Sequence, residues 1–252
     1  MPDAVTLVIQ PSAFLLDERV FPSLGVLKIA AVLEQAGYPV TVLDLSGVSD
    51  YEAETAGYLM RHPAGYYGLT MTTAQVPAAV RIARVLRRLV PQAVLIAGGP
   101  HVTMTQAAAR RGVARAATAL VPLRAHFDIL VAGDGEKAIL EALRDDAPAL
   151  IDADDPASPL FLTDGDLDAL PLPARHLIDL ASYQYSLGGR PATNVIAQLG
   201  CPFGCGFCGG RASPSFRRVR RRSIGRIIEE LAALREAYGY RAYMFQDDEL
   251  NV

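Results

Sequence analysis

The stretch DILVAGDGEKAILEAL, residues 128–143, decides the fold, because an apolar strand-like run enters a glycine turn and a helical pattern follows at once. The same order occurs upstream in VLIAGGPHVT, residues 94–103. Strands that are apolar almost throughout and alternate with helices are typical of a parallel sheet covered on both faces. The sequence therefore predicts an α/β domain with a doubly wound parallel sheet, which we place at residues 1–142.

The expected elements of this domain alternate along the chain. Strands are expected over 4–9, 40–44, 66–71, 93–97 and 128–131. Helices are expected over 24–36, 51–61, 77–89 and 137–144, and a further helix begins near 106–112. Gly37 is expected to end the first helix, and Pro77 to lie in the first turn of the third.

Small and polar residues follow three of the predicted strands, at the edge where a doubly wound sheet binds ligands. Glycine there allows a ligand to approach the backbone closely, which suits a large flat molecule or one that carries phosphate. A nucleotide, a flavin and a corrinoid all fit, and ordinary tight turns would also produce single glycine pairs. The candidate binding residues are Thr72, Thr73, Gly98, Gly99, Pro100, His101, Gly133, Asp134, Gly135 and Glu136.

The stretch QLGCPFGCGFCGGR, residues 198–211, contains all three cysteines of the chain. Cys201, Cys205 and Cys208 follow a C-x3-C-x2-C spacing. Three thiols cannot all pair as disulfides, and zinc would want a fourth ligand although no histidine lies nearby. Buried apolar cysteines are a further alternative, but core cysteines would not gather in a loop of glycine and proline. Iron–sulfur clusters are held by cysteines at short fixed spacings, so we favour a four-iron cluster.

A second unit is expected at residues 190–252, after a linker at 143–189. The linker is rich in Asp and Pro, and its acidic residues are interpreted as a solvated face. The second unit should contain a strand at 193–199, the cysteine loop, a helix at 224–238 and a strand at 242–246. An arginine-rich segment after the loop is interpreted mostly as a solvated lead-in to the helix, with anion binding as the alternative; its residues are Arg211, Arg217, Arg218, Arg220, Arg221 and Arg222.

The cysteine loop, with an aromatic residue before its third cysteine and a strand before its first, resembles that of the radical S-adenosylmethionine (radical SAM) enzymes. The resemblance implies a [4Fe-4S] cluster whose unique iron is chelated by SAM, the first strands of a partial β/α barrel, and a flavodoxin- or ferredoxin-like electron donor. It also implies that Phe207 lies next to the adenine. Polar groups that end the second strand would meet the amino group of SAM; here these are Asp247, Asp248 and Glu249.

The glycine-rich strand ends of residues 1–142, together with PSLGVLKIAAVLEQAGYPVTVLDL (22–45), resemble the cobalamin-binding domain that precedes many radical SAM domains. The resemblance implies bound cobalamin, although some family members keep the domain without the corrinoid. The D-x-H-x-x-G motif, whose histidine ligates cobalt in mutases and methionine synthase, is absent from the sequence. The resemblance therefore implies base-off cobalamin without a lower histidine ligand. His101 is expected to line the cavity or cap the next helix, with ligation of cobalt as the alternative.

Composition excludes several classes of protein. The chain has 252 residues, is 51% hydrophobic and carries a formal net charge of −3, which does not suggest nucleic-acid binding. No run approaches the roughly 18 apolar residues of a membrane span. The amino terminus lacks the shape of a signal peptide, and the cysteines form a reduced-thiol motif, so a cytoplasmic location is expected.

Two functions remain open at this point. The first is a cobalamin-dependent radical SAM enzyme, either a methyltransferase acting on an unactivated carbon or an enzyme of a related radical rearrangement. The second is a corrinoid-binding or sensory module whose cluster loop is vestigial or structural. A six-stranded partial barrel needs roughly 190 residues, so 190–252 is expected to hold only its beginning, and the chain alone to be incomplete. The substrate is expected to be a small molecule or a peptide.

Overall fold

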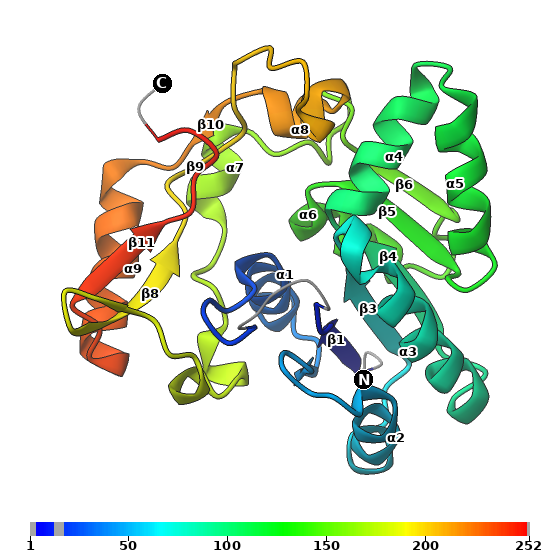
Figure 1. Cartoon of the computed structure of the whole chain (residues 1–252), viewed down its shortest axis with the longest axis horizontal. Coiled ribbons are helices and arrows are strands. Elements are labelled where there is room, and N and C mark those ends of the chain that lie inside the picture. The colour runs from blue at the N-terminus through cyan, green and yellow to red at the C-terminus, as the bar shows by residue number, and fades with distance from the viewer. Residues whose placement is uncertain (1–3, 13–17, 251–252) are drawn as a thin grey trace.

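The main body of the protein is a six-stranded parallel sheet. The computed structural model describes residues 4–12 and 18–250. The strands lie in the order β2-β1-β3-β4-β5-β6, on the right of Figure 1. They are β1 (Val5–Ile9), β2 (Val40–Asp44), β3 (Tyr66–Thr70), β4 (Val94–Gly98), β5 (Ile129–Gly133) and β6 (Leu150–Ala153).

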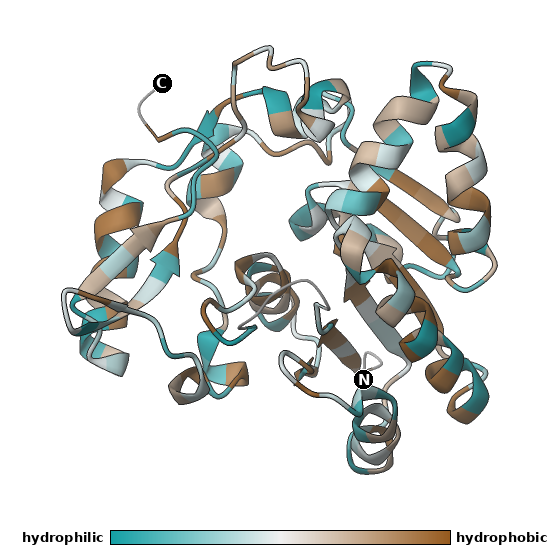
Figure 2. Ribbon diagram, in the orientation of Figure 1, coloured by the Kyte–Doolittle hydropathy of each residue, from teal (hydrophilic) through white to brown (hydrophobic). Residues whose placement is uncertain are grey.

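Helices cover both faces of this sheet because successive strand residues point to opposite sides. Val8 belongs to the apolar core that also contains residues of α2, α3, α4 and α5, whereas Leu7 belongs to the core shared with α1 and α6. Figure 2 shows the strands as the apolar centre of this body. The helices are α1 (Leu24–Gln35), α2 (Tyr51–Arg61), α3 (Val76–Leu89), α4 (Pro100–Arg110), α5 (Ala114–Arg124) and α6 (Gly135–Ala142).

The second unit is a small sheet packed against one long helix. Strands β8 (Arg190–Val195) and β11 (Ala242–Phe245) pair in parallel, and helix α9 (Ile224–Tyr238) lies between them in the chain. Strand β7 (Ser186–Leu187) pairs antiparallel with β8. The predicted doubly wound sheet followed by a βαβ unit is therefore confirmed. The remaining elements are α7 (Asp164–Ala169), β9 (Gln198–Leu199), α8 (Pro214–Arg217), β10 (Arg220–Arg221) and the short 3₁₀ turns Thr73–Gln75, Arg175–Leu177, Leu180–Ser182 and Gly209–Ala212.

The secondary structure differs from the expected elements at three places. The segment interpreted as a linker contains β6, which extends the sheet beyond β5. Helix α4 begins at Pro100, directly after the glycine turn, because proline is well tolerated at the first helical position. Helix α5 was not expected, and it contains Pro122 in its interior.

Polar contacts tie the segment that precedes the second unit to the first unit, beside α1. Asp44, at the end of β2, accepts hydrogen bonds from the Arg19 guanidinium at 3.0 Å and from the Tyr183 hydroxyl at 2.7 Å. The backbone N–H of Ala174 donates to the carbonyl of Leu27 in α1 at 3.0 Å. Within residues 4–12 and 18–250, no helix combines the length and the apolar character that crossing a bilayer requires.

Candidate functional site

A cavity of about 280 Å³ opens at the carboxyl ends of the parallel strands. Its floor includes Thr70, Gly98 and Gly133, the last residues of β3, β4 and β5. Helices α1 and α6 form its sides, and Ile196 and Leu199 of the second unit form part of its wall. The strand order reverses direction between β1 and β3, so the cavity lies where doubly wound sheets bind their ligands.

Most of the candidate residues predicted from the strand ends border this cavity. They are Gly98, Gly99, Pro100, Gly133, Asp134, Gly135 and Glu136. Thr72 instead borders an adjoining cavity of about 330 Å³. The two cavities share Gly25, Thr70 and Pro100, so they form neighbouring parts of one hollowed edge.

The glycines of this edge serve different purposes. Gly99 and Gly133 have positive φ angles of 93° and 92°. A methyl group on Gly133 would overlap the backbone of Ala153 and Asp154, and one on Gly99 would lie 2.7 Å from the backbone nitrogen of Met71. The fold therefore requires glycine at these two positions for its own packing, whereas Gly98 has only ordinary contacts and faces the cavity.

His101 lies in the first turn of α4, directly after Pro100. Its Nδ1 is 3.0 Å from the hydroxyl oxygen of Thr73, and its backbone N–H donates to Met71 at 3.0 Å. Burial lowers the pKa of His101 below its ordinary value. The neutral ring, held by Thr73, helps to fix the residues that follow β3. His101 is not among the described residues that line either cavity.

Two buried carboxylates at the cavity edge are paired with cations. Glu136 is bonded to Lys28 of α1 at 2.6 Å, and Asp134 contacts Arg220 of the second unit. Burial by itself raises the pKa of Glu136, but the nearby Lys28 ammonium outweighs it and the pKa falls below its ordinary value. Burial raises the pKa of Asp134, and Arg220 offsets part of this effect. The edge thus carries two fixed charge pairs rather than free acids.

The three cysteines lie together on an open loop. Cys205 is exposed, and Cys201 and Cys208 are half-buried. The N–H of Cys208 donates to the carbonyl of Cys205 at 3.2 Å, and Phe207 is 94% exposed. In the described part of the chain, no three Cys, His, Asp or Glu side chains are arranged to hold a metal ion. The loop therefore offers three thiols of suitable chemistry but not a closed coordination geometry.

The acidic residues that follow β11 do not act alike. The carboxylate of Asp247 accepts the N–H groups of Ala197, at 3.0 Å, and Gln198. Burial raises the pKa of Asp247, and these backbone hydrogen bonds oppose that rise. Asp247 thus ties the end of β11 to the residues before the cysteine loop, whereas Asp248 is exposed and Glu249 is half-buried.

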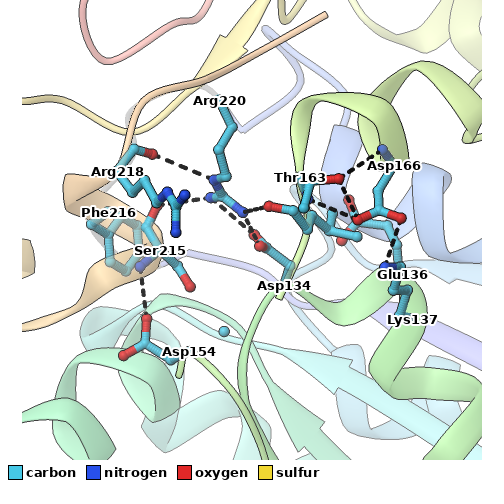
Figure 3. A network of polar contacts seen from close by, with 12 residues as sticks. Asp134, Glu136, Lys137, Asp154, Thr163, Asp166, Ser215, Phe216, Arg218 and Arg220 are labelled. Carbon is cyan, nitrogen blue, oxygen red and sulfur yellow. Dashed lines mark hydrogen bonds and ion pairs between the residues drawn. The ribbon is translucent and has the colours of Figure 1, made fainter. Parts of the chain in front are cut away.

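Sequence reasoning missed several residues that build the site. Arg220 is 1% exposed and Asp154 is fully buried, so the interpretation of the arginine-rich segment and of the acidic linker as solvated was wrong for these two. Figure 3 shows both in one polar network. Lys28 was also missed, although a single lysine in an otherwise apolar helix segment (LGVLKIAAVL) is a signal that it has a buried partner.

Comparisons with known proteins agree with this geometry. The family model for the B12 binding domain matches residues 18–143. The uncharacterized methyltransferase PH0819 of Pyrococcus horikoshii is 27% identical in an alignment of length 242 that covers 90% of this chain and 49% of that protein. The anaerobic magnesium-protoporphyrin IX monomethyl ester cyclase of a Synechocystis species is 24% identical in an alignment of length 247 that covers 90% of this chain and 45% of that protein. The chain thus spans about half the length of these curated relatives.

Solved structures share the fold across both units. The radical SAM methyltransferase TsrM of Kitasatospora setae, solved with tryptophan and a SAM analogue, has a TM-score of 0.69 at 19% identity; the match covers 99% of this chain and 48% of that one. The cobalamin-dependent SAM radical enzyme OxsB, solved with aqua-cobalamin and SAM, has a TM-score of 0.68 at 12% identity, and the match covers 98% and 34%. Together with the family model, these likenesses confirm the predicted resemblance. Residues 18–143 contribute most of the residues that line the cavity described above, and through them the chain belongs to the B12-binding domain family.

Proposed function

We propose that this chain carries the cobalamin site and the cluster loop of a cobalamin-dependent radical SAM enzyme that methylates an unactivated carbon. One observation carries the proposal: the cavity at the strand ends of the B12-binding domain is walled by Ile196 and Leu199, which lie just before the cysteine loop. The two cofactor sites would then adjoin each other. When bound, cobalamin supplies a methyl carrier, and a cluster with SAM supplies one-electron chemistry.

The residues at the sheet edge fit a large, flat, amide-bearing cofactor. Gly98 leaves space above the sheet, and apolar side chains of α1 and α6 border the cavity. Gln10, which is 2% exposed, borders the second cavity, and neither atom of its side-chain amide has a hydrogen-bond partner within the described residues. A cofactor with amide groups on its rim supplies such partners. Burying a polar group without a partner is costly, so the orphaned amide favours a bound ligand here.

The cysteine loop fits a cluster by the chemistry of its donors. Cys201, Cys205 and Cys208 would hold three irons, and the loop would close around them on binding. Phe207 is almost fully exposed, and in this proposal it would cover a ligand of the remaining iron. Asp248 and Glu249 are the acidic residues left to meet an ammonium group, since the carboxylate of Asp247 already accepts two backbone N–H groups.

One observation favours a second candidate, a corrinoid-binding or sensory module with a structural loop. No metal-binding group of three side chains is assembled in the described residues, the cysteines included. In that case, the second unit would only cover the cavity, and the chain would bind cobalamin without iron.

Anaerobic reconstitution separates the two candidates. The chain is loaded with iron and sulfide, and iron is counted per chain while methylcobalamin is titrated in the dark by its absorbance. The enzyme proposal predicts about four irons per chain together with saturable cobalamin binding. Cobalamin binding without iron supports the module, and iron without cobalamin binding contradicts the assignment of the cavity.

The role of the cysteine loop in cleaving SAM is tested by product analysis. The reconstituted chain, with SAM and a reductant, should release 5'-deoxyadenosine and lose this activity when Cys205 is replaced by Ala. The matched control is Thr118→Ala, a change at an exposed position of α5 whose hydroxyl donates to the carbonyl of Ala114 in the same helix. SAM cleavage that persists unchanged in Cys205→Ala contradicts the role of the loop.

A further inference from the structure

The cysteine loop is held to the cavity edge through one buried arginine. Arg220 lies in β10, and its guanidinium contacts Asp134, which follows β5 and borders the cavity. The same group donates to the carbonyl of Ser215 at 2.8 Å and lies 4.8 Å from the ring centre of Phe161. Figure 3 shows how this side chain joins the two units. Arg220 therefore fixes the segment that follows the cysteine loop onto the sheet edge.

A second carboxylate holds the same segment. Asp154, which follows β6, accepts the hydroxyl of Ser213 at 2.5 Å and the N–H of Ser215 at 2.9 Å. The next residue, Phe216, accepts the N–H of Cys201 at 3.0 Å. A short chain of hydrogen bonds thus runs from the ends of β5 and β6, through residues 213–220, to the first cysteine.

A ligand in the cavity would touch both ends of this connection. Asp134 borders the cavity on the side of the B12-binding domain, and Leu199 borders it on the other side, two residues before Cys201. Filling the cavity restrains both walls at once. Arg220 connects the same two walls, because it contacts both Asp134 and the segment that binds Cys201.

We propose that Arg220 is a positioning residue that couples ligand binding at the sheet edge to the order of the cysteine loop, so that bound cobalamin protects Cys201. The proposal rests on the proposed function, which identifies cobalamin as the ligand. Coupling between two binding sites is reciprocal. Loading the cluster should therefore raise the affinity for cobalamin by the same factor by which cobalamin favours the cluster.

The cysteines provide a direct measurement, because the chain has no thiols outside this loop. Alkylation of each cysteine is followed by mass spectrometry of its peptides, without and with saturating methylcobalamin, whose methyl ligand keeps the cobalt closed to thiols. In the wild type, bound cobalamin should slow the alkylation of Cys201 by at least about fivefold. Cys205, which is exposed and lacks the contact with Phe216, should be protected least.

Two variants test the role of the arginine. Arg220→Lys keeps the positive charge but loses the planar fork that reaches several acceptors, so it should bind cobalamin and lose most of the protection at Cys201. Arg144→Lys is the matched control, because Arg144 pairs with Asp146 on an exposed surface beyond α6. The control should keep the wild-type protection.

The outcomes distinguish the two proposals. Equal protection of Cys201 in cobalamin-loaded wild type and Arg220→Lys overturns the coupling, and so does a wild type that binds cobalamin without any protection. A wild type that does not bind cobalamin contradicts the proposed function and removes this inference with it. If Arg220→Lys does not fold, Asp134→Asn takes its place at saturating methylcobalamin with the same two outcomes, since it keeps the size of the side chain and removes the charge that faces Arg220.

Discussion

Gly98 and Gly133 end the adjacent strands β4 and β5, and replacing them by alanine should have opposite effects. Gly133→Ala should destabilise the fold, and Gly98→Ala should weaken ligand binding. Gly133→Ala places a methyl group against the backbone of Ala153 and Asp154 at a φ of 92°. A side chain at positive φ costs about 1–2 kcal/mol, and overpacking against a fixed strand adds about 1–3 kcal/mol. We therefore expect Gly133→Ala to lower the free energy of unfolding by about 2–5 kcal/mol.

Gly98→Ala should behave in the opposite way. Its methyl group would lie 3.5 Å from the carbonyl oxygen of Val131 and 3.7 Å from its Cβ, which are ordinary contacts, and its φ is not positive. The free energy of unfolding should change by less than about 1 kcal/mol. The same methyl group would occupy the cavity floor, and a misfit of about 1–3 kcal/mol corresponds to cobalamin binding that is about 5 to 150 times weaker.

Both variants are measured in the same two assays. Urea unfolding, followed by circular dichroism, gives the free energy of unfolding, and titration with methylcobalamin gives the dissociation constant. A Gly133→Ala chain as stable as the wild type would refute the packing argument. A Gly98→Ala chain that binds cobalamin with wild-type affinity would show that the ligand does not use this cavity floor.

Three further predictions concern the loop, the histidine and the second unit. Changing any one of the three cysteines to Ala should abolish the four-iron cluster, as judged by iron content and charge-transfer absorbance; an unchanged iron content in the triple variant contradicts the assignment. Burial lowers the pKa of His101 from its ordinary 6.5, so the unfolded chain binds the proton at a higher pH than the folded chain does. The contribution of the neutral His101 to the free energy of unfolding should therefore be fully present above pH 6.5 and decrease as the pH falls below it. His101→Asn should remove that part of the pH dependence in urea titrations and leave the spectrum of bound cobalamin unchanged; a large spectral shift would identify the histidine as a cobalt ligand. Glu230→Gln should cost about 3–5 kcal/mol of unfolding free energy, because it leaves Arg175 and Arg222, which contact Glu230 at 2.9 and 2.6 Å, without their buried partner; a melting temperature equal to the wild type would contradict this.

The periodic part of the fold could be predicted from the sequence. The bounds of α2, α9 and β2 agree with those expected from apolar spacing and flanking turn residues. Strand β6 was missed because LIDA is only four residues long and has an aspartate inside it. The residues of β6 have little strand preference of their own, and pairing with β5 stabilises the strand. A strand that depends on such a long-range partner has no local pattern by which the sequence could predict it.

The site was predictable where the topology decides it and not where charges pair across the units. The residues after β4 and β5 had to meet at one edge, because all parallel strands end there. The burial of Arg220 and Asp154 depends on how the second unit folds back over that edge. Nothing in a run of arginines indicates which of them is buried. The pairing of Arg220 with Asp134, and that of Asp154 with Ser213, can be seen only in the structure.

The odd number of thiols on the open loop also affects how the protein behaves in air. Without iron, dioxygen can oxidise two neighbouring cysteines of one chain to a disulfide, which leaves the third without a mate. Because Cys205 is exposed, the remaining thiol in part of the molecules is free to react with another chain. Preparations handled aerobically should therefore accumulate covalent dimers that a reducing gel separates into monomers. Anaerobic purification should therefore keep the chains free of these covalent cross-links.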